Sequence, residues 1–250
     1  MLRRRVIPCL DVRGGRLVKG VRFRELRDCG DPVDAAEGYA AAGADEIVWL
    51  NIAAEAEGWR ELLEAVERAA ERVDIPLTVG GGIDRPERAR ELLLAGADKI
   101  SVNSAALRTP ELIDELAERL GSQCVVVAMD AARGDGGWWT YSRGGMQATG
   151  IETVEWAQEA ARRGSGELLV TSIDSDGGRR GYDLELIGRI RDRVRVPLIA
   201  SGGAGGAGDI VAALQAGADA ALAATIFHDG ETTPDDVKRE VAACGLPARV

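Results

Sequence analysis

The sequence is poor in the residue types that most often build metal sites and redox centres. It contains one histidine, four cysteines and 4% aromatic residues among 250. A single histidine excludes a multi-histidine metal site and most histidine-based proton relays. The cysteines lack metal-like spacing, so we expect no metal, no cofactor, and reduced thiols in a cytoplasmic protein.

Long apolar runs and excess positive charge are also missing. No apolar run approaches the ~18 residues that suggest a membrane-spanning helix. The basic start at 1–5 is followed by an apolar segment too short for a signal peptide. The formal net charge is −10, which argues against nucleic acids and anionic membranes as partners. An anionic substrate would therefore need local positive potential.

Glycine, by contrast, is abundant and ends two apolar segments that each follow a proline. They are Pro-Leu-Thr-Val-Gly-Gly-Gly at 76–82 and Pro-Leu-Ile-Ala-Ser-Gly-Gly at 197–203. Short apolar runs of this kind predict buried strands. Glycines after a strand let backbone N–H groups approach an anion, and a following helix directs its positive dipole there. One such segment more often marks a tight turn, but two favour a pair of phosphate sites.

The two segments belong to an internal repeat. Pro76 and Pro197 lie 121 positions apart, as do the Gly-Ala-Asp triplets at 96–98 and 217–219. This offset, near half the chain length, predicts one domain (1–250) made of two half-barrels, about 1–121 and 122–250. We therefore expect two anion sites related by pseudo-twofold symmetry, and a ligand with two phosphates.

Strand and helix patterns alternate eight times, which predicts an α/β fold, a single (β/α)8 TIM barrel. A doubly wound open sheet is the alternative. The expected strands are 6–12, 46–52, 77–79, 99–103, 124–130, 167–172, 198–201 and 220–224, and the expected helices are 32–42, 59–73, 86–95, 110–120, 153–163, 184–194, 209–216 and 234–243.

Asp11 and Asp130 end the first expected strand of each half, 119 positions apart. In such barrels the chemistry lies at the C-terminal ends of the strands. A carboxylate there is a candidate general acid or base, although a single aspartate would equally well cap its loop. Two at equivalent places favour proton-transfer chemistry.

Collinear motifs then cover nearly the whole chain: Ile-Pro-Cys-Leu-Asp-Val at 7–12, Val-Lys-Gly at 18–20, Leu-Arg-Asp at 26–28, Val-Gly-Gly-Gly-Ile at 79–83, Gly-Ala-Asp-Lys at 96–99, Val-Asn-Ser-Ala at 102–105, Gly-Tyr-Asp at 181–183, Ala-Ser-Gly-Gly-Ala-Gly at 200–205 and Ala-Ala-Thr-Ile-Phe-His at 223–228. With these motifs the chain resembles the cyclase subunits of imidazole glycerol phosphate synthase. The sister isomerase of histidine synthesis shares the half-barrel repeat, but 26–28 and 174–177 are more similar to the cyclase.

The resemblance implies a reaction and a site. Ammonia and a bisphosphorylated ribulosyl formimino-aminoimidazole carboxamide ribotide would give imidazole glycerol phosphate and aminoimidazole carboxamide ribotide. Asp11 and Asp130 match the acid/base pair, and Lys19 matches a mobile lysine on the loop after the first strand. Substrate and phosphate contacts match Gly82, Asn103 and Ser104 at one end, and Asp176, Gly177, Ser201, Gly202, Gly203, Ala224 and Thr225 at the other.

The family also implies a partner, a separate glutaminase that delivers ammonia along the barrel axis in a heterodimer. A ring of charges at that entrance matches Arg5, Glu46, Lys99 and Glu167, and Asp98 matches a partner-facing position. The residues alone equally allow an ion-paired plug that stabilises the barrel, because Glu46 and Glu167 are repeat-equivalent and two cations can pair with them.

Four stretches depart from the family pattern. Asn51 replaces an aspartate, Gly178 replaces a threonine, Met146-Gln147 stand where a basic pair is usual, and 206–209 lacks the usual acidic-histidine start. These changes leave open a retuned paralogue with a related phosphorylated substrate, or an engineered or reconstructed sequence. A non-catalytic scaffold for a glutaminase and the isomerase are further alternatives.

Overall fold

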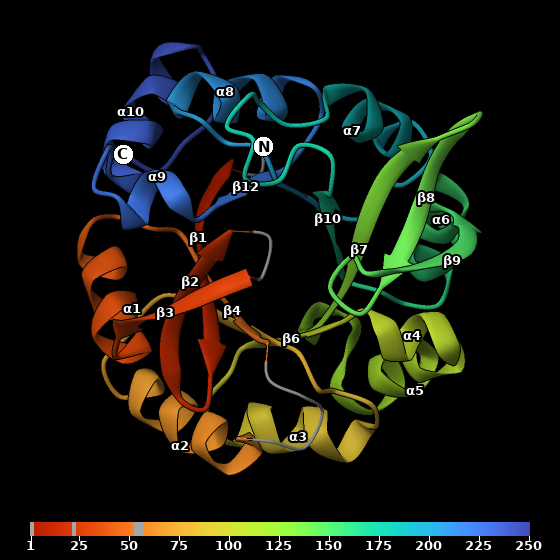
Figure 1. Ribbon diagram of the computed structural model, residues 1–250, viewed down its shortest axis with the longest axis horizontal. Helices are drawn as coiled ribbons and strands as arrows, with labels where there is room; N and C mark the ends of the chain where they lie inside the picture. Colours follow the sequence, from red (N-terminus) through yellow and green to blue (C-terminus); the bar gives the residue numbers. More distant parts are fainter. Residues whose placement is uncertain (1–2, 22–23, 53–57) are drawn as a thin grey trace.

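Eight parallel strands close into a barrel in the computed structural model, which describes residues 3–21, 24–52 and 58–250, with side chains at 19–27 excepted. The strands follow the order β10-β11-β12-β1-β4-β5-β6-β7, and β10 also pairs with β7 (Figure 1). This last pairing closes the ring, so the predicted (β/α)8 barrel is confirmed and the open sheet is wrong.

All sixteen predicted elements are present, with ends that match or shift by up to four residues. The barrel strands are β1 (Arg5–Arg13), β4 (Ile47–Asn51), β5 (Leu77–Gly80), β6 (Lys99–Val102), β7 (Val125–Gly134), β10 (Glu167–Ser172), β11 (Leu198–Ser201) and β12 (Ala220–Ala223). The long helices are α1 (Pro32–Ala41), α2 (Trp59–Ala70), α3 (Pro86–Leu94), α5 (Glu111–Leu120), α6 (Thr153–Arg162), α7 (Leu184–Arg191), α8 (Ala207–Gln215) and α10 (Pro234–Ala243).

Local sequence explains where several helices begin. The Asp31 carboxylate accepts a hydrogen bond from the Val33 N–H, and Pro32 occupies the first turn of α1, where no N–H partner is needed. The Asp183 carboxylate accepts from the Leu186 N–H at the start of α7, and the Thr233 hydroxyl accepts from the Asp236 N–H at the start of α10. Polar caps thus mark where α1, α7 and α10 begin.

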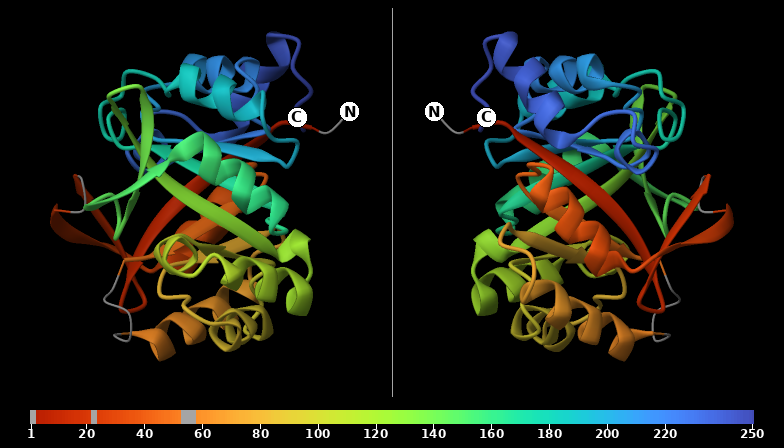
Figure 2. Two further views of the ribbon diagram at one scale, coloured as in Figure 1. Left: turned by 90° about the vertical axis from the view of Figure 1, so that its right-hand side faces the viewer. Right: turned by 90° about the vertical axis from the view of Figure 1, so that its left-hand side faces the viewer.

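Two hairpins replace loops that the sequence pattern did not resolve. The segments β2 (Arg16–Val21) and β3 (Arg24–Gly30) follow β1, and β8 (Gly137–Ser142) and β9 (Gln147–Glu152) follow β7. Figure 2 shows both hairpins projecting from the same end of the barrel. Lys19 therefore lies on strand β2 rather than on a loop, and its side chain is outside the described part of the structure.

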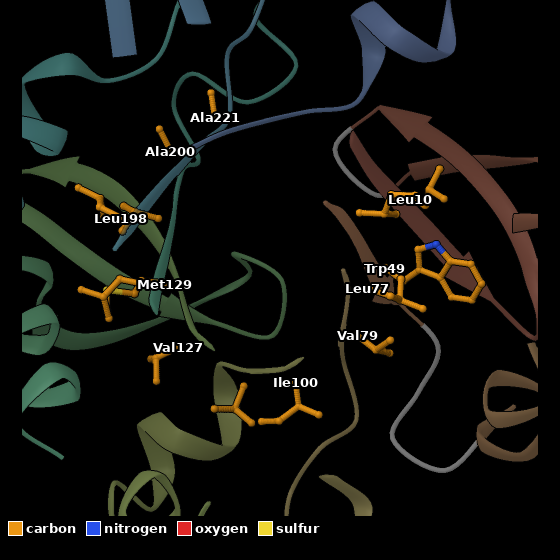
Figure 3. Packing of buried hydrophobic residues seen from close by; sticks show 14 of the residues in the cluster. Leu10, Trp49, Leu77, Val79, Ile100, Val127, Met129, Leu198, Ala200 and Ala221 are labelled. Carbon is orange, nitrogen blue, oxygen red and sulfur yellow. The ribbon is translucent and has the colours of Figure 1, made fainter. Parts of the chain in front are cut away.

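The apolar core has two compartments. A large one lies between the strands and the surrounding helices and contains Leu10, Trp49, Ile100, Met129 and Leu198, which Figure 3 shows around the ring of strands. A smaller one fills the barrel itself, with Ile7, Cys9, Val48, Val126, Leu169, Ile199, Ala220 and Leu222. The barrel is consequently a packed core, which holds the functional end rigid.

Matching contacts recur in the two halves. The Asp98 carboxylate accepts from the Leu77 N–H at 2.8 Å, and 121 positions later Asp219 accepts from the Leu198 N–H at 3.0 Å. The short helices α4 (Ser104–Arg108) and α9 (Thr225–His228) follow β6 and β12 at the same offset. These pairs support the half-barrel repeat, while the boundary between residues 121 and 122 stays a prediction.

Two further observations concern the chain ends and the helices. The Arg4 N–H donates to the Pro247 carbonyl at 2.6 Å, so both described ends of the chain lie together. Among the described residues, no helix combines the length and apolar character that crossing a membrane requires.

Candidate active site

Side chains along each strand point alternately into and out of the barrel. This alternation determines which of them face the interior at the C-terminal ends of the strands, a region that we call the mouth. On β1 the residues Ile7 and Cys9 face the interior, so Asp11 faces it too, one layer higher. On β7 the inward residues Val126 and Ala128 lead in the same way to Asp130. The two predicted acid/base residues therefore face one mouth from opposite halves of the barrel.

Burial raises the pKa of both carboxyl groups toward neutral pH. Desolvation, with a further contribution from the charge of Asp176, raises the pKa of Asp11 to about 6. Desolvation likewise raises the pKa of Asp130 to about 6, against hydrogen bonds that lower it. A carboxyl with a pKa near 6 takes up and releases protons close to neutral pH, as an acid/base catalyst must.

Asp130 is held by two neighbours. The Asn103 side-chain amide donates to it with 3.0 Å between Nδ2 and Oδ2, and the Gly145 N–H donates to it from the turn between β8 and β9. The other amide atom, Asn103 Oδ1, is buried and has no partner among the described residues. Buried polar atoms are normally satisfied, so this acceptor is available to a ligand in the mouth.

A third carboxylate, Asp176, stands in the loop after β10. Its charge raises the pKa of Asp11, Asp130 and Cys9, so it acts electrostatically on the acid/base pair. The sequence assigned Asp176 to substrate binding and missed this electrostatic role. Its position after the sixth barrel strand, across from two other strand-end aspartates, was the available signal.

One predicted phosphate end brings together Gly82 after β5, Asn103 after β6 and Ser104 at the start of α4. Gly82 has a φ of 74°, which glycine adopts without strain. The Ser104 hydroxyl accepts a hydrogen bond from the Arg143 N–H at 2.8 Å. The β8–β9 turn thus touches this end as well as Asp130.

The other predicted phosphate end combines loops after β10, β11 and β12. Here the chain approaches itself so closely that only glycine fits: a Cβ on Gly202 would lie 2.7 Å from the Ser172 carbonyl oxygen. The repeat-equivalent Gly81 would meet the Asn51 carbonyl at 2.0 Å. The residues assigned to this end, at and after the ends of these strands, are Asp176, Gly177, Ser201, Gly202, Gly203, Ala224 and Thr225.

The predicted ring of charges closes the opposite end of the barrel. Arg5 bonds Glu46 at 2.6 Å and Glu167 at 2.9 Å, and Lys99 bonds the same carboxylates at 3.0 and 2.6 Å. Burial would raise the pKa of Glu167, but Arg5 and Lys99 outweigh it and hold the pKa below its usual value. Asp98 follows α3 at this same end, so it lies apart from the mouth.

The single histidine, His228, connects three elements around the mouth. Its Nε2 lies 3.0 Å from the Cys9 carbonyl oxygen, and its Nδ1 lies 2.6 Å from the Tyr39 hydroxyl. These contacts link α9, which carries Thr225, to α1 and to the strand that carries Asp11. The histidine therefore has a positioning role that its solitary occurrence did not suggest.

Comparison with known proteins agrees with this geometry. A family model described as histidine biosynthesis protein matches residues 5–233. The imidazole glycerol phosphate synthase subunits HisF of Synechococcus sp. and Exiguobacterium sibiricum are each 53% identical over the full length of both chains. That of Trichormus variabilis is 51% identical over the whole chain and 99% of its own length. The chain therefore belongs to the histidine biosynthesis protein family, and within it to the HisF subunits of imidazole glycerol phosphate synthase.

Proposed function

We propose that the barrel closes an imidazole ring, as a carbon–nitrogen lyase and cyclase. Ammonia and the bisphosphorylated ribulosyl formimino-aminoimidazole carboxamide ribotide enter; imidazole glycerol phosphate and aminoimidazole carboxamide ribotide leave. The observation that carries this proposal is the pair Asp11 and Asp130, buried at equivalent strand ends with pKa values of about 6.

Proton movements in this reaction suit two carboxyl groups on opposite sides of one mouth. When ammonia adds to the ketone carbon, its nitrogen must lose protons while the ketone oxygen gains them and departs as water. When the ring closes, the amine that leaves on the second product must gain a proton. Asp11 and Asp130 would each alternate between acid and base through these steps, and a pKa near neutrality favours both directions.

The phosphate ends would fix the substrate across the mouth, so that its central ketone lies between the two aspartates. Asn103 contributes to the acid/base pair and to the phosphate end, because its Nδ2 donates to Asp130 and its unpartnered Oδ1 can accept from the substrate. A substrate held at two ends pre-organises the reacting atoms and lowers the entropic part of the barrier.

Ammonia would come from a separate glutaminase subunit docked over the ring of Arg5, Glu46, Lys99 and Glu167. The relatives are named as synthase subunits, which supports a complex with a partner. Leu94, the last residue of α3, is 74% exposed near Asp98 at this end of the barrel. Its place at the end of the barrel that carries the ring makes it a candidate contact for the partner.

Turnover of the bisphosphate with excess ammonium salt, followed by ultraviolet absorbance, tests the reaction. We expect turnover by the isolated chain and its loss in Asp11→Asn. The isomerase alternative predicts consumption without ammonia, and the scaffold alternative predicts binding without turnover. A retuned paralogue predicts weak turnover that Asn51→Asp increases, although full-length relatives favour the cyclase.

Leu94→Ser tests the partner face, with the purified glutaminase subunit of a related synthase as the probe. We expect glutamine-dependent turnover to fall while ammonium-dependent turnover stays. Leu184→Ser is the matched control, since Leu184 is 42% exposed at the mouth end of α7. Equal glutamine-dependent turnover in both variants would remove Leu94 from the proposed interface.

A further inference from the structure

Two residues other than glycine adopt a positive φ in the described part of the chain, and both are arginines at the mouth. Arg143 has a φ of 55° in the β8–β9 turn, and Arg179 has a φ of 53° in the loop after β10. Glycine or asparagine would occupy such positions with less strain. Strained backbone of this kind concentrates at functional sites. We therefore ask what the arginine side chain contributes at each position.

The Arg143 backbone is fixed onto two parts of the candidate site. Its N–H donates to the Ser104 hydroxyl at 2.8 Å, and two residues later the Gly145 N–H donates to Asp130. Within the turn, the Met146 N–H closes back onto the Ser142 carbonyl at 3.1 Å. The turn is therefore a defined structure that presents position 143 beside the phosphate end containing Ser104.

The guanidinium of Arg143 is uncommitted within the described structure. Arg179 pairs with Glu231, and Arg133, on β7, pairs with Glu185. Arg143 is exposed and its side chain makes no ion pair or hydrogen bond with any described residue. A cation held in place by its backbone but left unpaired can bind an anion without first breaking a salt bridge.

The residues assigned to the adjoining phosphate end are uncharged, and the neighbouring Arg88 guanidinium is bound to the Gly82 carbonyl at 2.5 Å and pairs with Asp84. Gly82, Asn103 and Ser104 are all neutral, while three carboxylates stand in the mouth and the chain carries a net charge of −10. The basic pair that the family resemblance leads one to expect in this turn is replaced by Met146-Gln147. A cation for a phosphate here must come from another position.

We propose that Arg143 is the phosphate-binding cation of this end, with its guanidinium donating to non-bridging oxygens of a phosphate monoester seated at Gly82, Asn103 and Ser104. Arginine suits the task because its planar fork matches phosphate oxygens. The assignment rests on the proposed function, since it gives the bisphosphate substrate a charge contact at this phosphate end.

Arg143→Gly separates this role from a structural one, because it removes the cation and relieves the positive-φ strain together. We expect KM for the bisphosphate to rise about 10- to 100-fold with kcat within about twofold, and the melting temperature to stay or increase. Arg143→Lys, which keeps the charge but not the planar fork, should recover part of the loss in KM. Arg162→Gln, an exposed arginine on α6, controls for the loss of one charge. An unchanged KM in Arg143→Gly would overturn the proposal.

Inorganic phosphate provides a second readout that does not depend on turnover. Calorimetric titration of the wild-type chain should show two phosphate sites, and Arg143→Gly should weaken one of them and spare the other. Failure of the wild type to consume the bisphosphate would refute the proposed function. The titration would still test whether Arg143 binds phosphate. Identical phosphate binding by wild type and variant would refute the role of Arg143 alone.

Discussion

The side-chain amide of Asn103 donates a hydrogen bond to the Asp130 carboxylate across 3.0 Å. This bond stabilises the ionised carboxylate and so works against the desolvation that raises its pKa. The balance of the two holds the pKa of Asp130 at about 6. Asn103 therefore adjusts the acid/base group as well as lining the phosphate end.

Replacing Asn103 by leucine should raise the pKa of Asp130 above 6, because the donor is lost and the desolvation stays. The acidic limb of the kcat/KM profile should move to higher pH. Carbon-13 NMR titration of the aspartate carboxyl signals measures the same shift without turnover. Asn103→Ser, which keeps a donor, is the comparison, and a titration midpoint unchanged in Asn103→Leu would contradict this account.

Asp11→Asn should stabilise the fold while it abolishes turnover. The folded-state pKa of Asp11 is about 6 against an ordinary value of 3.8, so ionised Asp11 opposes folding above pH 6. The variant escapes this cost, which corresponds to about 1–3 kcal/mol. The gain should be full near pH 8 and fade as the pH falls from about 6 to 4, where the wild-type group is protonated in the folded and then the unfolded chain.

Urea unfolding at several pH values measures this difference. A gain that stayed constant down to pH 4 would show that the asparagine stabilises by packing rather than by removing a buried charge. The analogous change at Asp130 is less informative, since that carboxylate also accepts from Asn103 and Gly145.

The barrel was predictable because its signals are local and repeated. Proline before two of the short apolar runs, glycine after them and a fixed offset of 121 positions indicated where strands of both halves lie, and strand parity then placed Asp11 and Asp130 in the mouth. The predicted ion pairing of Glu46 and Glu167 followed from their repeat equivalence and is present.

The hairpins were missed for a physical reason. The segment Gln147–Glu152 is largely polar, and Arg16–Val21 mixes apolar and charged residues without a regular alternation. Each belongs to a hairpin outside the barrel, so neither carries the apolar pattern that identifies a barrel strand. The contacts of Arg143 with Ser104 and of His228 with Cys9 join residues far apart in sequence. Such contacts depend on how loops fold over the mouth, which no local pattern records.

Glu167→Gln should destabilise the barrel without abolishing ammonium-dependent turnover. The change leaves Arg5 and Lys99 facing one carboxylate instead of two in a largely buried ring, which costs about 3 kcal/mol. Turnover should persist because the apolar layer containing Val126 and Leu169 separates the ring from the mouth. Glu87→Gln, in an exposed pair with Arg119, should change the unfolding free energy by less than about 0.5 kcal/mol.

Chemical denaturation of both variants gives the comparison, and turnover with ammonium salt gives the second readout. Equal stability of Glu167→Gln and Glu87→Gln would mean that the ring contributes no more than a surface ion pair. Loss of ammonium-dependent turnover in Glu167→Gln would show that the two ends of the barrel are coupled.

Gly202→Ala should both destabilise the chain and weaken substrate binding. The residue has a φ of 87°, and an added Cβ would lie 2.7 Å from the Ser172 carbonyl oxygen. Strain and displacement of that backbone together should cost about 3 kcal/mol, and moving the loop should raise KM for the bisphosphate. Gly188→Ala is the matched control, because Gly188 lies in α7 with open space around its Cβ position and alanine favours helix by about 0.5–1 kcal/mol. Thermal unfolding should therefore move in opposite directions for the two variants, and a Gly202→Ala chain as stable as wild type would show that the close approach to Ser172 is not required by the fold.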